Sequence, residues 1–233
     1  MVAGLSNDAN RDAWIERQLG LIPANKKIID IGAGPCRYKK FCSHLDYTSQ
    51  DFCQYTGTGD GQGLQSGSWD YGQIDIVSDI TDIPVDDGTF DAVICTEVLE
   101  HLRDPIQGLR EISRVLKRSQ GATLLLTAPF ACLTHQSPHF YYTGFSEHFY
   151  TTHLSHLGFD LEIEENGNFF ECLAQEIHRL PGMAARFCNA GLSDNMIGTL
   201  RGLLDCLGEL SARDTGSSKL LSHGLHIRAV RRL

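Results

Sequence analysis

The 233-residue sequence has little positive charge. It carries 20 lysines and arginines against 29 aspartates and glutamates, which gives a formal net charge of −9 at pH 7. A protein that binds nucleic acid through general electrostatics needs the opposite balance, because it must neutralise phosphates. The basic residues Arg228, Arg231 and Arg232 lie together near the end of the chain, where solvated charge is the simplest interpretation. The composition therefore predicts no nucleic-acid partner.

Long apolar runs and paired cysteines are missing as well. No stretch approaches the roughly 20 apolar residues that span a bilayer, and the first residues lack a basic segment followed by an apolar run. The eight cysteines form no C-x-x-C pair and show no zinc-ligand spacing. These absences predict no membrane association, reduced thiols and a cytoplasmic location.

What is present is an alternation of short apolar strands and amphipathic helices. Strands are expected at residues 28–31, 47–51, 74–80, 90–96, 122–128, 159–165 and 225–230. Helices are expected at residues 13–19, 37–45, 105–117 and 146–157. Strands that alternate with helices form parallel βαβ units, so the pattern predicts a doubly wound α/β fold.

A helical pattern interrupts this alternation near the end of the chain. It extends over about residues 169–218, between the last two expected strands. Because the length suits one domain, we expect residues 1–233 to form a single domain with a helical insertion there. The last strand is expected to return as the edge partner of the strand at residues 159–165.

A glycine-rich turn follows the first strand and reads GAGPCR at residues 32–37. A dinucleotide site of the form G-x-G-x-x-G needs glycine where Arg37 stands, and a P-loop needs a Gly-Lys-Ser/Thr sequence that is absent. Asp30 precedes the turn, and its carboxylate is unsuited to a pyrophosphate. A ligand that carries an ammonium group suits it better.

With Asp30, the turn resembles the first motif of the class I S-adenosylmethionine-dependent methyltransferases, D-x-G-x-G-x-G. The sequence DIGAGPC matches at Asp30, Gly32 and Gly34 and departs at Cys36. The resemblance implies S-adenosylmethionine as cofactor. It also implies a mostly parallel, seven-stranded Rossmann-like sheet with an antiparallel last strand.

Later motifs continue the resemblance over about residues 25–165. It implies that an acid ending the second strand holds the ribose hydroxyls, that apolar and acidic groups surround the adenine, and that the fourth strand ends facing the methyl donor. The matching residues are Asp51, Phe52, Asp79, Ile80, Thr96 and Glu97.

Several of these residues also have simpler interpretations. Asp51 could be a solvated acid at a strand end, and Asp79 could cap a turn. Glu97 and His101 are four residues apart and could pair on one face of a helix. These alternatives stay open at the level of sequence.

The loop after the fifth strand is rich in histidine and aromatic residues. His135 and His139 lie between a strand end and a helix start, where family members place acceptor-binding groups, and either could act as a base. Packing beneath the loop is the alternative role for both.

No metal ligand is predicted. His135-x3-His139 lacks the third ligand of a catalytic zinc site. Glu97, Glu100 and His101 resemble an acidic-histidine motif of ubiquinone-pathway O-methyltransferases, some of which use a divalent ion, but the same phrase is widespread among relatives without metal.

The sequence thus predicts an S-adenosylmethionine-dependent methyltransferase that acts on a small-molecule acceptor. An oxygen of a sugar or secondary metabolite is the expected target, by association with similar chains. The alternative is a non-catalytic regulatory module that binds S-adenosylmethionine without turnover. The oligomeric state is left open.

Overall fold

The computed structural model describes residues 2–232, which form two compact units. The sheet unit contains residues 12–164 and 225–232, and the helical unit contains residues 2–11 and 165–224. The predicted insertion at about residues 169–218 lies within the helical unit. The organisation of the chain as a single domain stays a prediction.

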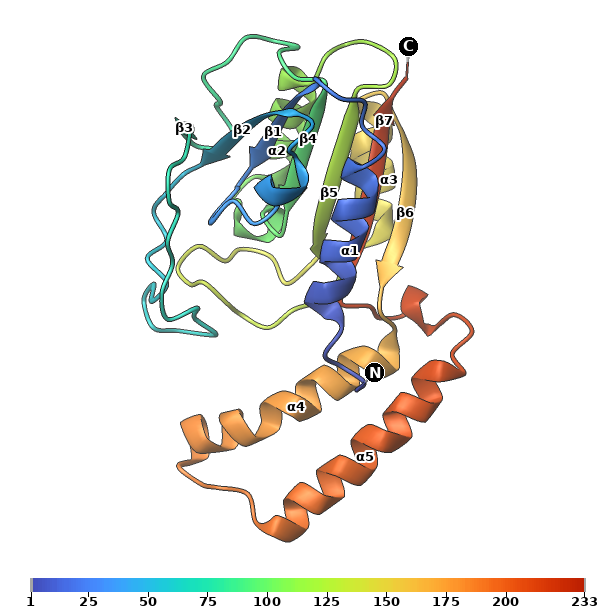
Figure 1. Cartoon of the computed structure of the whole chain (residues 1–233). Coiled ribbons are helices and arrows are strands. Elements are labelled where there is room, and N and C mark those ends of the chain that lie inside the picture. The colour runs from blue at the N-terminus through green and yellow to red at the C-terminus, as the bar shows by residue number, and fades with distance from the viewer. Residues whose placement is uncertain (1, 233) are drawn as a thin grey trace. The chain divides into compact units, whose positions relative to one another are not determined.

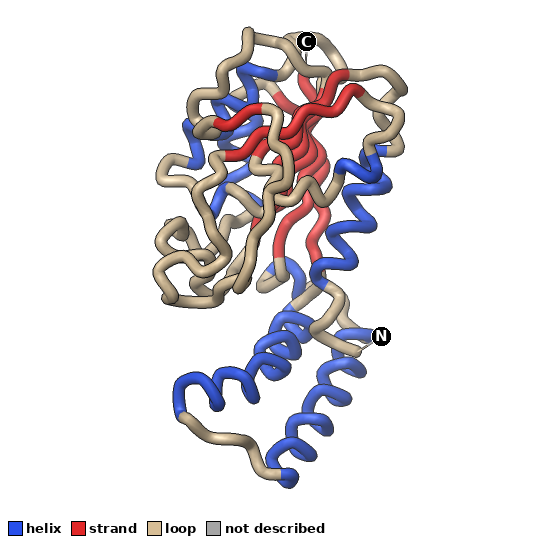
Figure 2. Tube along the Cα trace, turned by 60° about the vertical axis from the view of Figure 1, so that its left-hand side comes forward, coloured by secondary structure: helices blue, strands red, loops and turns tan. Residues whose placement is uncertain are grey.

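Seven strands form one sheet in the order β3-β2-β1-β4-β5-β7-β6 (Figures 1 and 2). Their bounds are β1 Lys27–Ile31, β2 Asp46–Asp51, β3 Ile76–Val77, β4 Ala92–Thr96, β5 Thr123–Pro129, β6 Phe159–Asn166 and β7 Gly224–Arg231. The pairs β1–β2, β1–β4, β2–β3 and β4–β5 are parallel. Strand order reverses between β1 and β4, and ligands of such sheets bind at the carboxyl ends of the strands near that point.

The last strand, β7, runs antiparallel to its neighbours. Arg231 at its end donates a backbone hydrogen bond to Ala122, before β5 begins, and Arg232 donates one to Gly158, before β6 begins. The predicted antiparallel last strand and its pairing with β6 are confirmed. Its predicted edge position is wrong, because β7 lies between β5 and β6 and leaves β6 at the edge.

Helices cover both faces of the sheet. Alternate residues of a strand point to opposite faces, so Ile29 and Ile31 pack with α2 (Pro105–Val115) and α3 (Glu147–His156). Ile28 packs on the other face with Trp14 and the C-terminal part of α1 (Asn7–Leu19). Asp30 shares the Ile28 face, and this places its carboxyl beneath the glycine turn.

Two expected elements are shorter than the sequence predicts. Residues 37–45 form only a 3-10 helix, η1 (Lys39–Phe41), because so short a segment without a side-chain cap gains little from helix propensity. Its conformation is set instead by Tyr38 and Cys42, which are buried in the core on either side of η1. The strand expected at residues 74–80 is reduced to β3. There the Asp75 carboxylate accepts hydrogen bonds from the backbone N–H and hydroxyl of Ser49, so a side chain replaces part of the strand ladder.

The helical unit contains a hairpin of two long helices, α4 (Phe169–Cys188) and α5 (Asp194–Ala212) (Figure 1). Each begins at a polar cap: Asn168 accepts from two backbone N–H groups of α4, and Ser193 accepts from one of α5. Leu207 of α5 packs with Ala174 of α4 and with Ala3 in a small core. Within residues 2–232, no helix has both the length and the apolar character needed to cross a membrane.

Candidate active site

The glycine turn after β1 needs residues without side chains. Gly32 and Gly34 both have positive φ values, 68° and 49°. A Cβ built on Gly32 would lie 2.4 Å from Val98 Cγ2, and one on Gly34 would lie 2.9 Å from Trp69 Cζ2. Cys36 also adopts a left-handed backbone, with φ 54°, so it occupies a conformation that glycine normally provides.

The Asp30 carboxyl is fully buried beneath this turn and accepts a 2.8 Å hydrogen bond from the Tyr47 hydroxyl. Burial raises its pKa from 3.8 to about 7; the Tyr47 hydrogen bond opposes this shift, and the nearby Asp51 charge adds to it. A cation beside Asp30 would favour its charged form. This pocket therefore suits a ligand with positive charge.

Asp51 joins the ends of β1 and β2. One carboxylate oxygen accepts from the Gly34 N–H at 2.9 Å, and the other accepts from the Cys53 N–H at 2.9 Å. Burial raises the pKa of Asp51, and these backbone N–H groups counteract part of that effect. Asp51 is 5% exposed, so the interpretation of a solvated strand-end acid is wrong.

Trp69 covers the glycine turn, although no motif in the sequence singles it out. Its ring packs between Tyr55, at a centroid distance of 5.5 Å, and Tyr71, at 6.3 Å. The indole Nε1 is buried and has no hydrogen-bond partner among the described residues. A buried donor of this kind suits a polar ligand atom at the turn. The one hint in the sequence is a tryptophan inside an otherwise small and polar loop.

Phe52 and His139 meet edge to face, with ring centroids 5.0 Å apart. This contact brings a residue predicted to pack on adenine against a residue predicted to serve the acceptor. The two predicted subsites therefore adjoin.

Asp79 is exposed and makes the turn-capping contacts of its simpler interpretation. One carboxylate oxygen accepts from the Thr81 backbone N–H at 2.8 Å and from the Thr81 hydroxyl at 2.7 Å. Ile80 beside it is buried in the main core. Their contacts with adenine stay a prediction.

The end of β4 places Thr96 and Glu97 at the carboxyl edge of the sheet. Glu97 has a positive φ of 54° and accepts a 2.8 Å hydrogen bond from the Thr127 hydroxyl of β5. The alternative that Glu97 and His101 share one face of a helix is excluded, because the 3-10 helix η2 (Leu99–His101) does not include Glu97.

The histidine loop after β5 is bonded to the glycine-rich loop after β2. Leu64 donates its N–H to the Thr134 carbonyl and accepts from the Gln136 N–H, both at 2.9 Å. The Asp60 N–H donates to the Ser137 carbonyl at 3.0 Å. Loops at residues 59–65 and 134–137 thus form one wall of the site.

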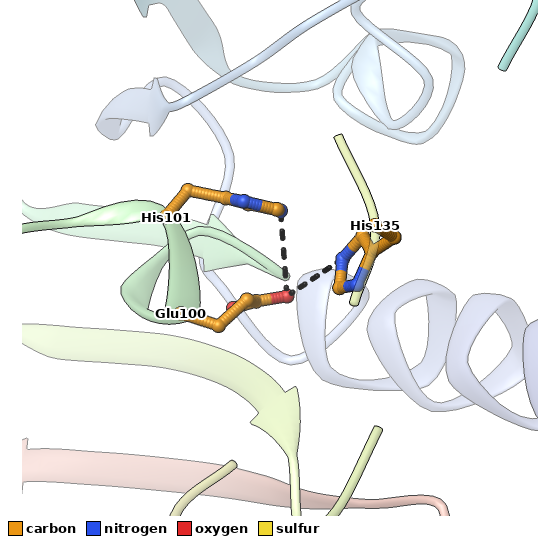
Figure 3. Close-up of side chains that lie close together, drawn as sticks. All are labelled: Glu100, His101 and His135. Carbon is orange, nitrogen blue, oxygen red and sulfur yellow. Dashed lines mark ion pairs between the residues drawn. The ribbon is translucent and has the colours of Figure 1, made fainter. Parts of the chain in front are cut away.

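His101 and His135 lie beside the fully buried Glu100 (Figure 3). Their Nε2 atoms are 3.7 Å and 3.8 Å from Glu100 Oε1. Burial lowers the pKa of His101 to about 4, and the neighbouring His135 contributes to that shift. This cluster could not be predicted from the sequence, because the two histidines are 34 positions apart.

Residues 29–123 match the sequence model of a family described as methyltransferase domain. These residues carry a methyltransferase domain. Its cofactor is S-adenosylmethionine, as the resemblance implied. No curated protein matches the sequence.

Solved structures, among them two methyltransferases, share the fold of this chain. A S-adenosylmethionine-dependent methyltransferase from Archaeoglobus fulgidus superposes with a TM-score of 0.56 at 16% identity, covering 96% of this chain and 94% of that one. The YcgJ protein from Bacillus subtilis gives 0.55 at 14% identity, with coverage of 97% and 99%. Phosphoethanolamine N-methyltransferase 2 from Haemonchus contortus, solved with S-adenosylmethionine, gives 0.52 at 18% identity, with coverage of 96% and 52%.

The methyltransferase domain gathers most of its predicted site residues at one edge of the sheet. Asp51 bonds the turn that contains Gly32 and Gly34, Asp30 lies below it, and Phe52 follows directly. Phe52 in turn contacts His139, while His135 is directed toward Glu100. Three features of the site fit the cofactor. They are the glycine turn, whose space a Cβ would fill, the buried acid Asp30, which favours a cation, and the buried indole donor of Trp69.

Proposed function

We propose that this methyltransferase transfers a methyl group to an oxygen of a small-molecule acceptor, such as a sugar or a secondary metabolite. The contact between Phe52 and His139 carries the proposal, because it sets a potential base beside the cofactor subsite. The net charge of −9 supports an acceptor other than nucleic acid. The eight free thiols support a cytoplasmic location.

The cofactor-binding residues are assigned by the same proposal. Asp30, Gly32 and Gly34 would hold the methionine portion, and Asp51 would accept hydrogen bonds from the ribose. The adenine and the methyl donor would be bordered by Phe52, Asp79, Ile80, Thr96 and Glu97. For Asp51 to serve the ribose, its carboxylate must add these hydrogen bonds to the two that it already accepts.

His139 is the stronger candidate for the base, since the His135 Nε2 atom is directed toward Glu100. When bound, S-adenosylmethionine supplies a methyl group on a sulfonium for in-line transfer to a nucleophile. A ring nitrogen of His139 takes the proton of the acceptor hydroxyl, and the oxygen becomes a better nucleophile. The loops at residues 59–65 and 134–137 hold the acceptor in line. His135 would line the same pocket.

Substitution of Asp51 tests the cofactor site. Asp51→Ala removes a buried carboxylate, and we expect S-adenosylmethionine to bind more than about tenfold more weakly in calorimetry. Asp46→Ala is the matched control, since Asp46 begins the same strand and is exposed. Unchanged affinity in a folded Asp51→Ala variant would remove Asp51 from the site.

Substitution of His139 separates the enzyme from a non-catalytic module. We expect His139→Ala to lower the rate of methyl transfer by about 10²-fold or more, while S-adenosylmethionine affinity changes far less. The measurement is transfer of labelled methyl to a panel of hydroxylated acceptors, with exposed His148→Ala as the control. Tight cofactor binding without transfer to any acceptor would favour the regulatory module.

A further inference from the structure

Three side chains from two segments direct ligand atoms at one point (Figure 3). Glu100 and His101 lie on η2 after β4, and His135 lies in the loop after β5. One carboxylate oxygen and two imidazole nitrogens lie within 4.8 Å of one another. The Glu100 side chain is 0% exposed and those of His101 and His135 are 13% and 23% exposed, so the point is shielded but reachable.

Backbone carbonyls fix the protonation of both rings at Nδ1. The Nδ1 of His101 bonds the His139 carbonyl, and the Nδ1 of His135 bonds the Leu133 carbonyl at 3.0 Å. A carbonyl only accepts, so each Nδ1 must carry a hydrogen and donate it. In the neutral rings both Nε2 atoms are then lone-pair donors. Metal-ligating histidines are oriented by the same kind of bond from the other ring nitrogen.

The space between these atoms is too wide for direct hydrogen bonds. The Nε2 atoms lie 3.7 Å and 3.8 Å from Glu100 Oε1, beyond the 2.7–3.2 Å typical of an N–H···O bond. Bonds of about 2.1 Å to a tetrahedral ion would place its ligand atoms about 3.4 Å apart. An ion would therefore draw each Nε2 atom a few tenths of an ångström closer to Glu100 Oε1. The widest pair of ligand atoms, within 4.8 Å of each other, would close by up to about 1.4 Å.

We propose that Glu100, His101 and His135 bind one divalent transition-metal ion. Two imidazoles and one carboxylate suit Zn²⁺ or Co²⁺ better than Mg²⁺, which favours oxygen ligands. Three protein ligands leave a position open, as catalytic zinc sites do. Glu97 is not part of this set; one of its carboxylate oxygens accepts a hydrogen bond from the Thr127 hydroxyl. The assignment rests on the geometry of these three side chains and not on the proposed acceptor.

The open position gives the ion a role at the acceptor. The ligand His101 bonds the carbonyl of His139, and the ring of His139 contacts Phe52. An ion at this point would bind an acceptor hydroxyl and lower its pKa. A base would then remove the hydroxyl proton more easily.

Titration of the whole metal-free chain with Zn²⁺ and Co²⁺ tests the site without S-adenosylmethionine. We expect one ion per chain by calorimetry. Bound Co²⁺ should show a visible d–d spectrum without thiolate-to-cobalt charge transfer, which separates the site from the exposed thiols of Cys188 and Cys206. Glu100→Gln and His135→Ala should each weaken binding at least tenfold, whereas exposed His156→Ala should not.

Three results would overturn the site: no stoichiometric ion on the wild-type chain, equal binding by all variants, or a thiolate spectrum. The His135→Ala variant changes a partly exposed loop residue, so it separates loss of a ligand from loss of the fold. Calorimetry with S-adenosylmethionine on the same samples reports the proposed cofactor site independently. Failure of one proposal therefore leaves the other measurable.

Discussion

In the proposed cofactor site, a proton and the cofactor's positive charge would compete for the buried carboxyl of Asp30. Its pKa of about 7 means that this group is partly protonated at neutral pH, unlike an ordinary aspartate. The same shift affects stability. Because the folded pKa lies above the unfolded value of 3.8, the stability contributed by the protonated form is complete below about pH 4 and is lost as pH rises through 7.

Binding of S-adenosylmethionine should therefore release protons near pH 7. A nearby cation favours the charged carboxylate and lowers its pKa, so up to about half a proton per chain should leave at that pH. Calorimetry in buffers of different ionisation enthalpy measures this release. Asp30→Asn should bind with a heat that no longer depends on the buffer. A wild-type heat that is the same in all buffers would contradict the prediction.

Some single residues could be predicted from sequence and others could not. Asp51 was predictable because its distance from the first motif fixes its place at the end of β2. Trp69 was not, because its contact with Gly34 depends on how an irregular loop folds back. The Glu100 cluster was missed for the same reason: loop geometry, which has no sequence period, brings His135 to it.

At the level of elements, the wall formed by residues 59–65 and 134–137 depends on close backbone approach. A Cβ on Gly59 would lie 1.9 Å from the Ser137 carbonyl oxygen. Gly61, two residues later, also has a positive φ but has no atom within 4 Å of the equivalent Cβ. Substitution of either glycine by alanine therefore strains the backbone. Only the substitution at Gly59 also brings a Cβ into collision with the opposite loop.

Gly59→Ala should separate the two loops. We expect faster amide hydrogen exchange at Leu64 and Gln136, whose N–H groups bond across the wall, and a lower rate of methyl transfer. Gly61→Ala should change neither by a comparable amount. If the Leu64 and Gln136 amides exchange equally slowly in both variants, the contact between the two loops does not depend on the close approach of Gly59.

The helical hairpin offers a similar comparison in its packing. Leu207 is buried in the small core of the helical unit, whereas Leu203, one turn earlier, is 43% exposed. Leu207→Ala should lower the free energy of unfolding by about 2–4 kcal/mol, and Leu203→Ala by less than about 1 kcal/mol. Urea denaturation followed by circular dichroism measures both. Similar losses in the two variants would contradict the packing described.

Among the elements, the strongly periodic ones were predicted well. The helix at residues 105–117 corresponds to α2, and the apolar run at residues 122–128 corresponds to β5 within one residue at each end. Predictions were wrong where a side chain or tertiary contact replaces backbone bonds, as with Asp75 beside β3 and with η1. Local propensity carries no information on such contacts.

For the whole molecule, the alternation of strands and helices was sufficient to predict the doubly wound sheet. The antiparallel last strand came from family resemblance, and its position between β5 and β6 was not foreseen. Apolar alternation shows that a strand is buried but does not identify its neighbours. The net charge of −9 also belongs to this scale, since it disfavours binding of phosphate-rich partners through general electrostatics.

The place of β7 also gives the sheet an order of assembly during translation. The strand between β5 and β6 is supplied by residues 224–231, about 60 residues after β6 ends. The ribosome adds about 5–20 residues per second, so one edge of β5 stays unpaired for several seconds after β6 has emerged. An unpaired strand edge is prone to pairing with other chains. The nascent chain is thus most in need of a chaperone while the helical hairpin is being made.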